Sequence, residues 1–130
     1  MKVSGTFEVK LNPLESYAKG IDKTNLGRMS IDKTFNGDLD AISQGDMLTA
    51  MTAVEGSAGY VAIEQVVGTL SGKKGSFVLQ HFGTMNKGKN SLVLEVVPDS
   101  GTNQLVGLVG TMALQVKDGQ HHYQFEYELA

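Results

Sequence analysis

The side chain with the clearest potential for chemistry is His81, which follows Phe77 and Leu79 at every second position of an apolar run. Alternate residues of a strand share a face, so this imidazole is expected to lie among hydrocarbon side chains. A neutral ring held there could orient a bound ligand, or accept a proton and return it. The alternative is a core histidine whose single hydrogen bond is satisfied inside the protein.

A second group of polar and aromatic residues offers a different lining for a binding pocket. Carboxylates inside a barrel are unfavourable unless they are paired, so this group either faces solvent or marks a polar pocket. The candidate ligand-binding residues are His81 on one face and, on the other, Tyr60, Glu64, Gln80, Phe82 and Glu95. The sequence leaves open which face points inward, and it identifies no catalytic residue.

Several other chemistries are not expected. The chain has no cysteine, so disulfide bonds, thiolate nucleophiles and thiolate metal ligands are excluded. His121 and His122 are neighbours, and neighbours in a strand point to opposite faces, so we expect no metal site. The run 72–76 lacks the spacing of a phosphate-binding loop, and no dinucleotide fingerprint lies between a strand and a helix. We therefore expect no cofactor.

The charge balance argues against nucleic acid and membrane as partners. Lys and Arg number 11 against 14 Asp and Glu, whereas nucleic-acid-binding domains carry a basic stripe or patch. No run approaches the roughly 20 apolar residues of a membrane-spanning helix. The segment Met1–Phe7 alternates like a strand and lacks the apolar block of a signal peptide. We therefore expect a cytoplasmic protein.

These side chains need a scaffold, and the chain predicts one made of short antiparallel strands. Glycine supplies 16 of 130 residues and proline 2, while the apolar runs are rich in Val, Ile, Phe, Tyr and Thr. That pattern is typical of an all-β fold with many turns. We predict one domain over residues 1–130, a single antiparallel closed barrel of about eight strands.

Turn signals divide the chain into strands. Asn36-Gly37, Lys87-Gly88 and Asp118-Gly119 favour hairpins, because Asn, Asp and Gly tolerate positive φ. We also expect turns at Gln44-Gly45 and over 72–75, and an end to the first strand at Asn12-Pro13. The expected strands are 4–11, 28–35, 39–42, 47–54, 60–70, 77–85, 92–97, 106–116 and 121–129, with a helical turn at 102–105.

The hairpin at Lys87-Gly88 also predicts a register. With these two residues as the loop, the pairs are Asn86–Lys89, Gly83–Leu92, Phe82–Val93, His81–Leu94, Gln80–Glu95 and Leu79–Val96. This pairing brings apolar residues opposite apolar ones and polar residues opposite polar ones, which is what fixes a register. The last strand is expected to pair back toward Phe7, Val9 and Leu11 and close the sheet.

Part of the chain resembles a known family. The resemblance is carried by Gly37–Leu39 with Gly45–Leu48, by Tyr60–Glu64 and Ser76–His81, and by Val97–Thr102 with Leu105–Gly110. On these stretches the chain, from about Arg28 onward, resembles a small bacterial family of unknown function. Such proteins are similar in fold to allene oxide cyclase, a lipocalin-like barrel of eight antiparallel strands. The resemblance implies a fold and no activity, and no cyclase catalytic motif carries over to this sequence.

Two classes of function fit a small barrel of this kind. The first is binding of a small, largely apolar molecule inside the barrel, oriented by His81, Gln80 or Glu95. The second is a minimal isomerase or cyclase, in which a carboxylate or His81 moves a proton in a dry cavity. A third possibility is an interaction protein whose lumen is packed solid. Because both faces of the central runs are apolar, we also expect a homo-oligomer, most simply a dimer.

Overall fold

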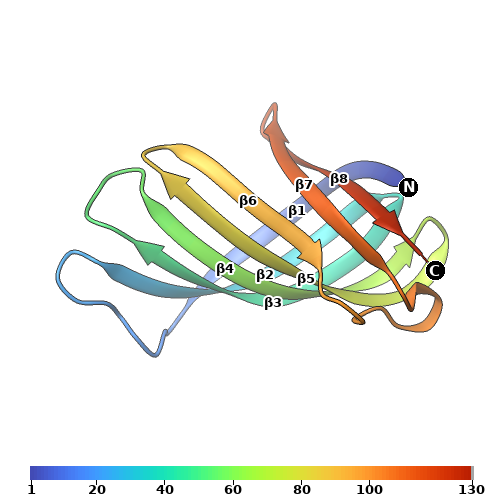
Figure 1. Ribbon diagram of the computed structural model, residues 1–130, viewed down its shortest axis with the longest axis horizontal. Helices are drawn as coiled ribbons and strands as arrows, with labels where there is room; N and C mark the ends of the chain where they lie inside the picture. The colour runs from blue at the N-terminus through green and yellow to red at the C-terminus, as the bar shows by residue number, and fades with distance from the viewer. Residues whose placement is uncertain (130) are drawn as a thin grey trace.

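The chain forms the predicted closed barrel of eight antiparallel strands, and the computed structural model describes residues 1–129 (Figure 1). Each strand pairs with its neighbours in the sequence, and the last strand returns to the first. The strands are β1 (Lys2–Leu14), β2 (Asn25–Gly37), β3 (Leu39–Met51), β4 (Ala58–Leu70), β5 (Lys73–Asn86), β6 (Lys89–Val96), β7 (Val109–Lys117) and β8 (Gln120–Glu128). The predicted helical turn is η1 (Asn103–Leu105), a 3-10 turn between β6 and β7.

Two-residue turns explain much of the strand pairing. Lys87 and Gly88 both adopt positive φ, 50° and 89°, a backbone that continues the right-handed twist of the strands it joins. The register predicted from this turn is confirmed for every predicted pair, including His81 opposite Leu94. The β4–β5 turn differs from expectation, because Ser71 and Gly72 form the loop and residues 73–75 already belong to β5.

The predicted closure between the last strand and the first is confirmed. β8 pairs with β1 over the segment Lys2–Phe7, and Phe7 lies opposite His121. The closing ladder therefore uses the beginning of β1, whereas we expected it to continue along the strand as far as Leu11. The difference leaves the later part of β1 with a single partner, β2.

That free side explains why β1 does not end at Asn12-Pro13, as the sequence predicted. Pro13 lies in the ladder opposite Met29 of β2, and β1 continues to Leu14. Proline has no N–H group, so it is tolerated where a strand has a partner on one side only. The stop signal is overridden because this part of β1 is an edge.

A second correction concerns Gln44-Gly45, which lies inside β3 and not at a turn. One long strand replaces the two short strands expected at 39–42 and 47–54. Gly45 lies opposite Glu64 of β4, and a Cβ atom at Gly45 would come within 2.6 Å of the Glu64 Cα atom. The glycine thus serves the close approach of two strands and does not reverse the chain.

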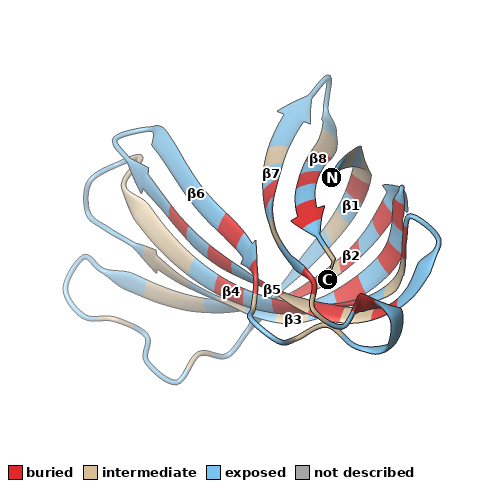
Figure 2. Cartoon of the chain, turned by 45° about the vertical axis from the view of Figure 1, so that its right-hand side comes forward, coloured by how far each residue is buried: buried red, intermediate tan, exposed pale blue. Residues whose placement is uncertain are grey.

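Apolar side chains fill the end of the barrel at which β1 begins and β8 ends (Figure 2). Leu105 of η1 and Leu108 just after it are each 1% exposed and pack into this cluster, so the β6–β7 connection covers this end. The buried cluster comprises Phe7, Phe35, Leu39, Ala41, Val66, Leu70, Phe77, Leu79, Leu94, Val96, Leu105, Leu108, Met112, Tyr123, Phe125 and Tyr127. The barrel is therefore closed and packed on this side.

The opposite end, which we call the mouth, is open. There the last residues of β3 and β5 and the first residues of β4 and β6 are intermediate or exposed (Figure 2). Between β6 and β7 the described ladder consists of one pair, Glu95 opposite Thr111. Beyond that pair the two strands diverge toward the mouth (Figure 1).

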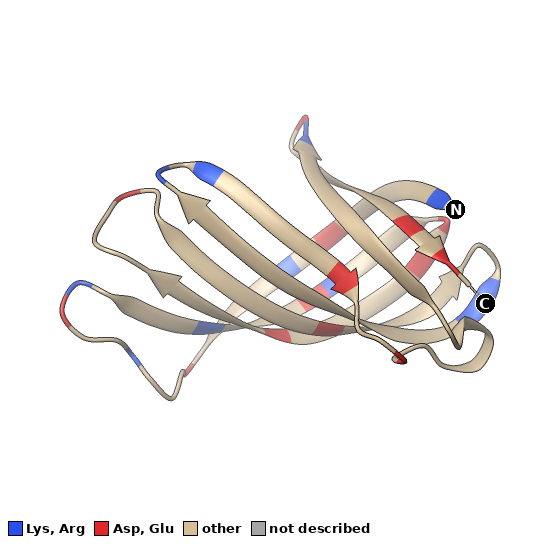
Figure 3. Cartoon of the chain, in the orientation of Figure 1, with Lys and Arg blue, Asp and Glu red and all other residues tan. Residues whose placement is uncertain are grey.

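Charged side chains are spread over the strands and turns, with basic and acidic residues interspersed (Figure 3). Among the described residues, no helix has the length and the apolar character needed to cross a membrane.

Candidate functional site

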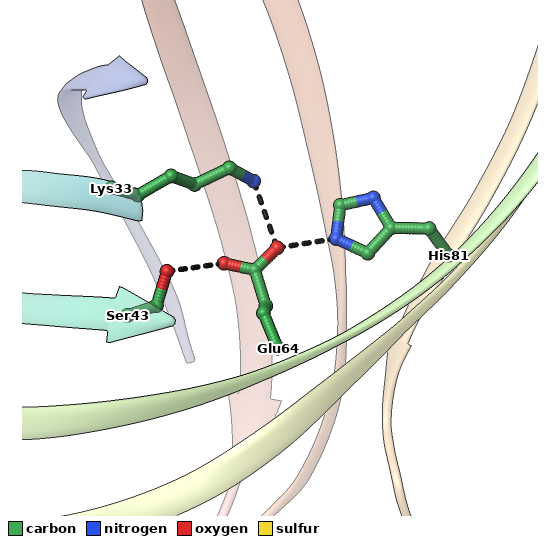
Figure 4. A network of polar contacts seen from close by, with 4 residues as sticks. All are labelled: Lys33, Ser43, Glu64 and His81. Atoms are coloured by element: carbon green, nitrogen blue, oxygen red, sulfur yellow. Dashed lines mark hydrogen bonds and ion pairs between the residues drawn. The ribbon is translucent and has the colours of Figure 1, made fainter. Parts of the chain in front are cut away.

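A buried polar layer lies between the packed end of the barrel and its mouth, and Figure 4 shows its four side chains. Glu64 is at its centre: Lys33 Nζ donates to Oε2 over 2.9 Å, and Ser43 Oγ donates to Oε1 over 2.6 Å. Nε2 of His81 also contacts Oε2 of Glu64. These residues come from the adjacent strands β2, β3, β4 and β5, and none is more than 6% exposed. The layer is therefore dry and built by the sheet itself.

Glu64 is ionised in this setting. Burial alone would raise the pKa of its carboxyl group, because it disfavours the charged form. The hydrogen bond with His81, the charge of Lys33 and the hydrogen bond with Ser43 outweigh that effect and lower the pKa to about 2. At neutral pH the layer therefore holds a carboxylate and an ammonium group in contact.

The ammonium group of Lys33 is also placed against two aromatic rings. Its Nζ atom lies 5.1 Å from the centroid of the Phe7 ring and 5.7 Å from that of Phe35. A cation over the face of an aromatic ring is attracted by the ring quadrupole. Phe7 and Phe35 therefore help to hold the lysine beside Glu64.

His81 is the one member of the layer with an unused polar atom. A carboxylate can only accept hydrogen bonds, so the contact with Glu64 assigns the proton to Nε2 of His81. Nδ1 then carries a lone pair in the neutral ring. This Nδ1 atom is buried, and it has no hydrogen-bond partner among the described residues. An acceptor is thus left free inside the barrel.

A hollow of about 510 Å³ lies at the mouth, next to this layer. Its side chains are apolar or uncharged, and they come from β3 to β7, most of them from inward positions. They include Met47, Thr49, Met51, Ala58, Tyr60, Met85, Asn90, Leu92 and Leu114. We call this hollow the mouth pocket.

Tyr60 connects the mouth pocket to the polar layer. Its side chain lines the pocket, and its ring centroid lies 6.1 Å from that of His81. The ring lies over Gly83, where a Cβ atom would come within 2.9 Å of Tyr60 Cδ1. Burial raises the pKa of the Tyr60 phenol, and the nearby charge of Glu64 raises it further. The phenol therefore stays protonated and remains a hydrogen-bond donor.

The predicted site residues separate into two groups. Tyr60, Glu64 and His81 face the interior, whereas Gln80, Phe82 and Glu95 are exposed on the outer surface of the barrel. The prediction that Tyr60 and Glu64 share a face with Gln80, Phe82 and Glu95 is wrong. The two-residue β4–β5 loop places even-numbered residues of β4 opposite odd-numbered residues of β5, such as Glu64 opposite Leu79.

Sequence reasoning missed Lys33 and Ser43 as members of the site. The signal for Lys33 is present, because it alternates with Ile31 and Phe35, both of which are buried. A lysine on an apolar face indicates a buried partner of opposite charge. Nothing distinguishes Ser43 in the sequence, and its role follows from its place opposite Lys33 in the β2–β3 ladder.

The outer surface has hollows of its own. One of about 520 Å³ lies beneath the Ser16–Ala18 loop and includes Leu48, Val61 and Phe82 in its lining. Another of about 580 Å³ lies against Gln80, Phe82 and Glu95. Both lie on the outer side of strands β3 to β6, and we call this surface the outer sheet face. Its large apolar residues with about half their surface exposed include Leu48, Val61, Ile63, Phe82 and Val93.

Comparison with known proteins gives a family and a fold. The family described as "Protein of unknown function (DUF3224)" matches residues 3–127. The chain is similar to a crystal structure of a protein with unknown function from the DUF3224 family, from Shewanella oneidensis MR-1. The two are 62% identical, with a TM-score of 0.98 over 100% of this chain and 97% of the other. No curated protein gives a significant match.

Proposed function

The chain belongs to the DUF3224 family of proteins of unknown function, and we propose that it binds a small, largely apolar molecule in the mouth pocket. The pocket has a volume of about 510 Å³, which is within the range of small-molecule sites. A hollow of this size in the lumen also argues against the alternative of a solid-cored interaction protein.

The polarity of the lining restricts the chemical class of the ligand. Among the described residues, no charged side chain lines the mouth pocket, and methionines contribute three of its residues, Met47, Met51 and Met85. Methionine is flexible and polarisable and adapts to apolar ligands of varied shape. An ionic ligand would lose its hydration without gaining a counter-ion there, so a neutral molecule is favoured.

The observation that carries the proposal is the free Nδ1 atom of His81, whose ring lies beside Tyr60, a residue of the pocket lining. A buried acceptor without a partner is unfavourable, and a ligand that supplies a donor relieves that penalty. Ligand sites typically combine apolar walls with a small number of fixed polar groups. His81 and the Tyr60 phenol fill that role in this proposal.

Titration with the neutral fluorescent probe 1-aminoanthracene tests the proposal. We expect saturable binding, weakened by Leu114→Trp, which fills the pocket, and retained by Gln115→Trp, whose side chain is exposed on the same strand. Equal binding by both variants, or no binding by the unmodified protein, contradicts the proposal.

We also propose that the protein is a homodimer that associates through the outer sheet face. Its support is the exposed apolar cluster on that face, of which Phe82 is 59% exposed and Ile63 and Val93 are 49% exposed. Soluble monomers rarely expose large contiguous apolar patches, and a two-fold axis would bury this face against its own copy.

We also propose that this barrel is related to the allene oxide cyclase fold and that the protein is cytoplasmic. The kinship of this barrel with the allene oxide cyclase fold is supported by the strand number and the antiparallel, sequential order. A structural comparison with that enzyme family tests it. A cytoplasmic location rests on the sequence alone, and fractionation of cells with an antibody against the chain tests it.

A further inference from the structure

We propose that His81 is a general base that removes a proton from a neutral, largely apolar carbonyl compound bound in the mouth pocket. The substrate class is a ketone or similar molecule with an acidic C–H bond next to the carbonyl, and the reaction is a proton-transfer isomerisation. This inference rests on the proposed binding of an apolar molecule and adds chemistry to it.

The contact with Glu64 leaves one nitrogen of His81 free to act as a base. Because Nε2 donates to the Glu64 carboxylate, the lone pair lies on Nδ1, and no group of the described residues uses it. When Nδ1 takes up a proton, the ring becomes an imidazolium in contact with a fixed negative charge. A carboxylate that orients a histidine and stabilises its charged form is the arrangement found in hydrolytic triads. Glu64 is therefore a positioning residue.

The charges around His81 balance before and after the proton transfer. Lys33 and Glu64 already neutralise each other within the layer, so the resting site carries no net charge. Proton transfer from the substrate creates an imidazolium and an enolate together, and the pair is again neutral overall. A dry site favours a transfer in which opposite charges develop close to each other.

Tyr60 provides a partner for the carbonyl oxygen of the substrate. The Tyr60 phenol stays protonated and lines the pocket, so it can donate a hydrogen bond to a carbonyl that becomes an enolate. In the reaction the C–H bond breaks, its electron pair forms a C=C bond, and the carbonyl oxygen takes the negative charge. The proton on Nδ1 then returns to another carbon of the conjugated system, so no co-reactant is consumed.

Tyr60 also controls the access of a substrate to Nδ1 of His81. His81 is 3% exposed, so a substrate reaches it only after a neighbouring side chain moves. Tyr60 packs against His81 on one side and borders the open mouth pocket on the other. Its ring therefore has room to turn away from its place over Gly83, which carries no side chain to hold it.

The test uses 5-nitrobenzisoxazole, a neutral bicyclic molecule that reports on bases in apolar sites. A base removes its ring C–H proton, the electron pair forms a nitrile, and the N–O bond breaks to give a coloured phenolate. We expect saturable turnover that falls roughly 10-fold or more in His81→Gln, in line with the typical contribution of a general base. The matched control His122→Gln lies on β8 and should react like the unmodified protein.

The division between kcat and KM separates a base from a structural histidine. The charged groups that face His81 are Glu64 directly and Lys33 through Glu64, and the Tyr60 ring packs beside it. In His81→Gln kcat should fall while KM changes little, because the base acts on the probe after it has bound. In Glu64→Gln kcat should also fall, because the imidazolium formed in the reaction loses its counter-charge. An unchanged kcat in Glu64→Gln contradicts its positioning role.

The outcomes separate this inference from the proposed function. Displacement of 1-aminoanthracene by 5-nitrobenzisoxazole without faster turnover overturns the general base and leaves ligand binding intact. Unchanged turnover in a folded His81→Gln protein has the same meaning. If neither probe binds, both proposals fail. Should His81→Gln not fold, Tyr60→Phe serves as the second variant, because it keeps the ring and removes only the phenolic donor; full turnover in it contradicts the role of Tyr60.

Discussion

The ammonium nitrogen of Lys33 lies 2.9 Å from Oε2 of Glu64, and both side chains are withdrawn from solvent, at 5% and 0% exposure. The pair joins β2 to β4 across the interior, while Ser43 of β3 binds the other carboxylate oxygen. It links three adjacent strands at one level of the barrel. The first predictions follow from this pair.

Removing one partner of the pair should destabilise the fold strongly. Lys33→Met leaves the Glu64 carboxylate without its counter-ion, and breaking a buried ion pair in this way costs about 3–5 kcal/mol. Urea denaturation measures the free energy of unfolding. The matched control is Asp46→Asn in the exposed Arg28–Asp46 pair, 3.1 Å apart with the two side chains 42% and 59% exposed, which should cost less than about 1 kcal/mol. Equal losses of unfolding free energy in the two variants would show that the buried pair stabilises the fold no more than the exposed pair.

Acid should unfold the protein through Glu64. Its pKa is lowered from 4.5 to about 2 in the folded state, so the stabilisation is fully present above about pH 4.5 and is lost as the pH falls toward 2. The shift corresponds to about 3 kcal/mol. Between neutral pH and pH 2, the urea midpoint should fall less steeply for Glu64→Gln than for the unmodified protein. An equally steep fall in the two proteins would rule out Glu64 as the main acid-sensitive group.

A methyl group at Gly83 should disturb Tyr60. Gly83→Ala places a Cβ atom within 2.9 Å of Tyr60 Cδ1, and such overpacking costs about 1–3 kcal/mol. Gly59→Ala is the matched control on the paired strand, because its Cβ atom would meet its nearest neighbour at 3.8 Å. Thermal unfolding should show a lower Tm for Gly83→Ala alone. A fully additive Gly83→Ala/Tyr60→Ala double variant would show that the ring is not the cause.

The tautomer of His81 can be observed directly. We expect ¹⁵N spectra of the histidine rings to show a proton on Nε2 of His81 and an unprotonated Nδ1, because the Glu64 carboxylate accepts from Nε2. In Glu64→Gln the preference should weaken, since a side-chain amide can also donate. A proton on Nδ1 in the unmodified protein would contradict the assignment on which the free acceptor depends.

The dimer proposal predicts a defined effect of charge on the outer sheet face. Phe82→Glu and Val93→Glu place a carboxylate on paired positions of β5 and β6, where two copies would meet across the two-fold axis. Sedimentation should show a dimer for the unmodified protein and a monomer for either variant. Gln115→Glu, on the outer surface of β7, is the control and should leave the mass unchanged. A monomeric unmodified protein would refute the proposal.

Local signals in the sequence predicted much of the fold. The Lys87-Gly88 pair was sufficient for the β5–β6 register, because a two-residue loop with positive φ at both positions fixes which residues face each other. The alternation of Tyr123, Phe125 and Tyr127 placed the last strand against the first. Both features are determined by residues close together in the sequence, so they can be predicted from a single segment.

The candidate site depended on information that a single segment does not carry. Its four side chains come from four strands, and their meeting depends on the registers of three ladders at once. The turn expected over 72–75 left the length of the β4–β5 loop open, and with it the parity that separates Glu64 from Gln80. A one-residue change in a loop exchanges the inner and outer faces of a strand. For Lys33, the alternation with Ile31 and Phe35 indicates an inward position. The sequence does not indicate that its partner is Glu64, which lies on another strand.

The single described pair between β6 and β7, Glu95 opposite Thr111, bears on the order of folding. The ladders from β1 to β6 all join neighbours in the sequence, so each closes a short loop at small entropic cost. The β7–β8 hairpin, by contrast, attaches mainly to β1, from the far end of the chain. Its docking closes the longest loop in the protein, and with so little pairing to β6 it gains little from the strand that precedes it. The barrel is therefore expected to form as a curved six-stranded sheet that the last hairpin completes, and in the reverse direction this hairpin is the first element to detach.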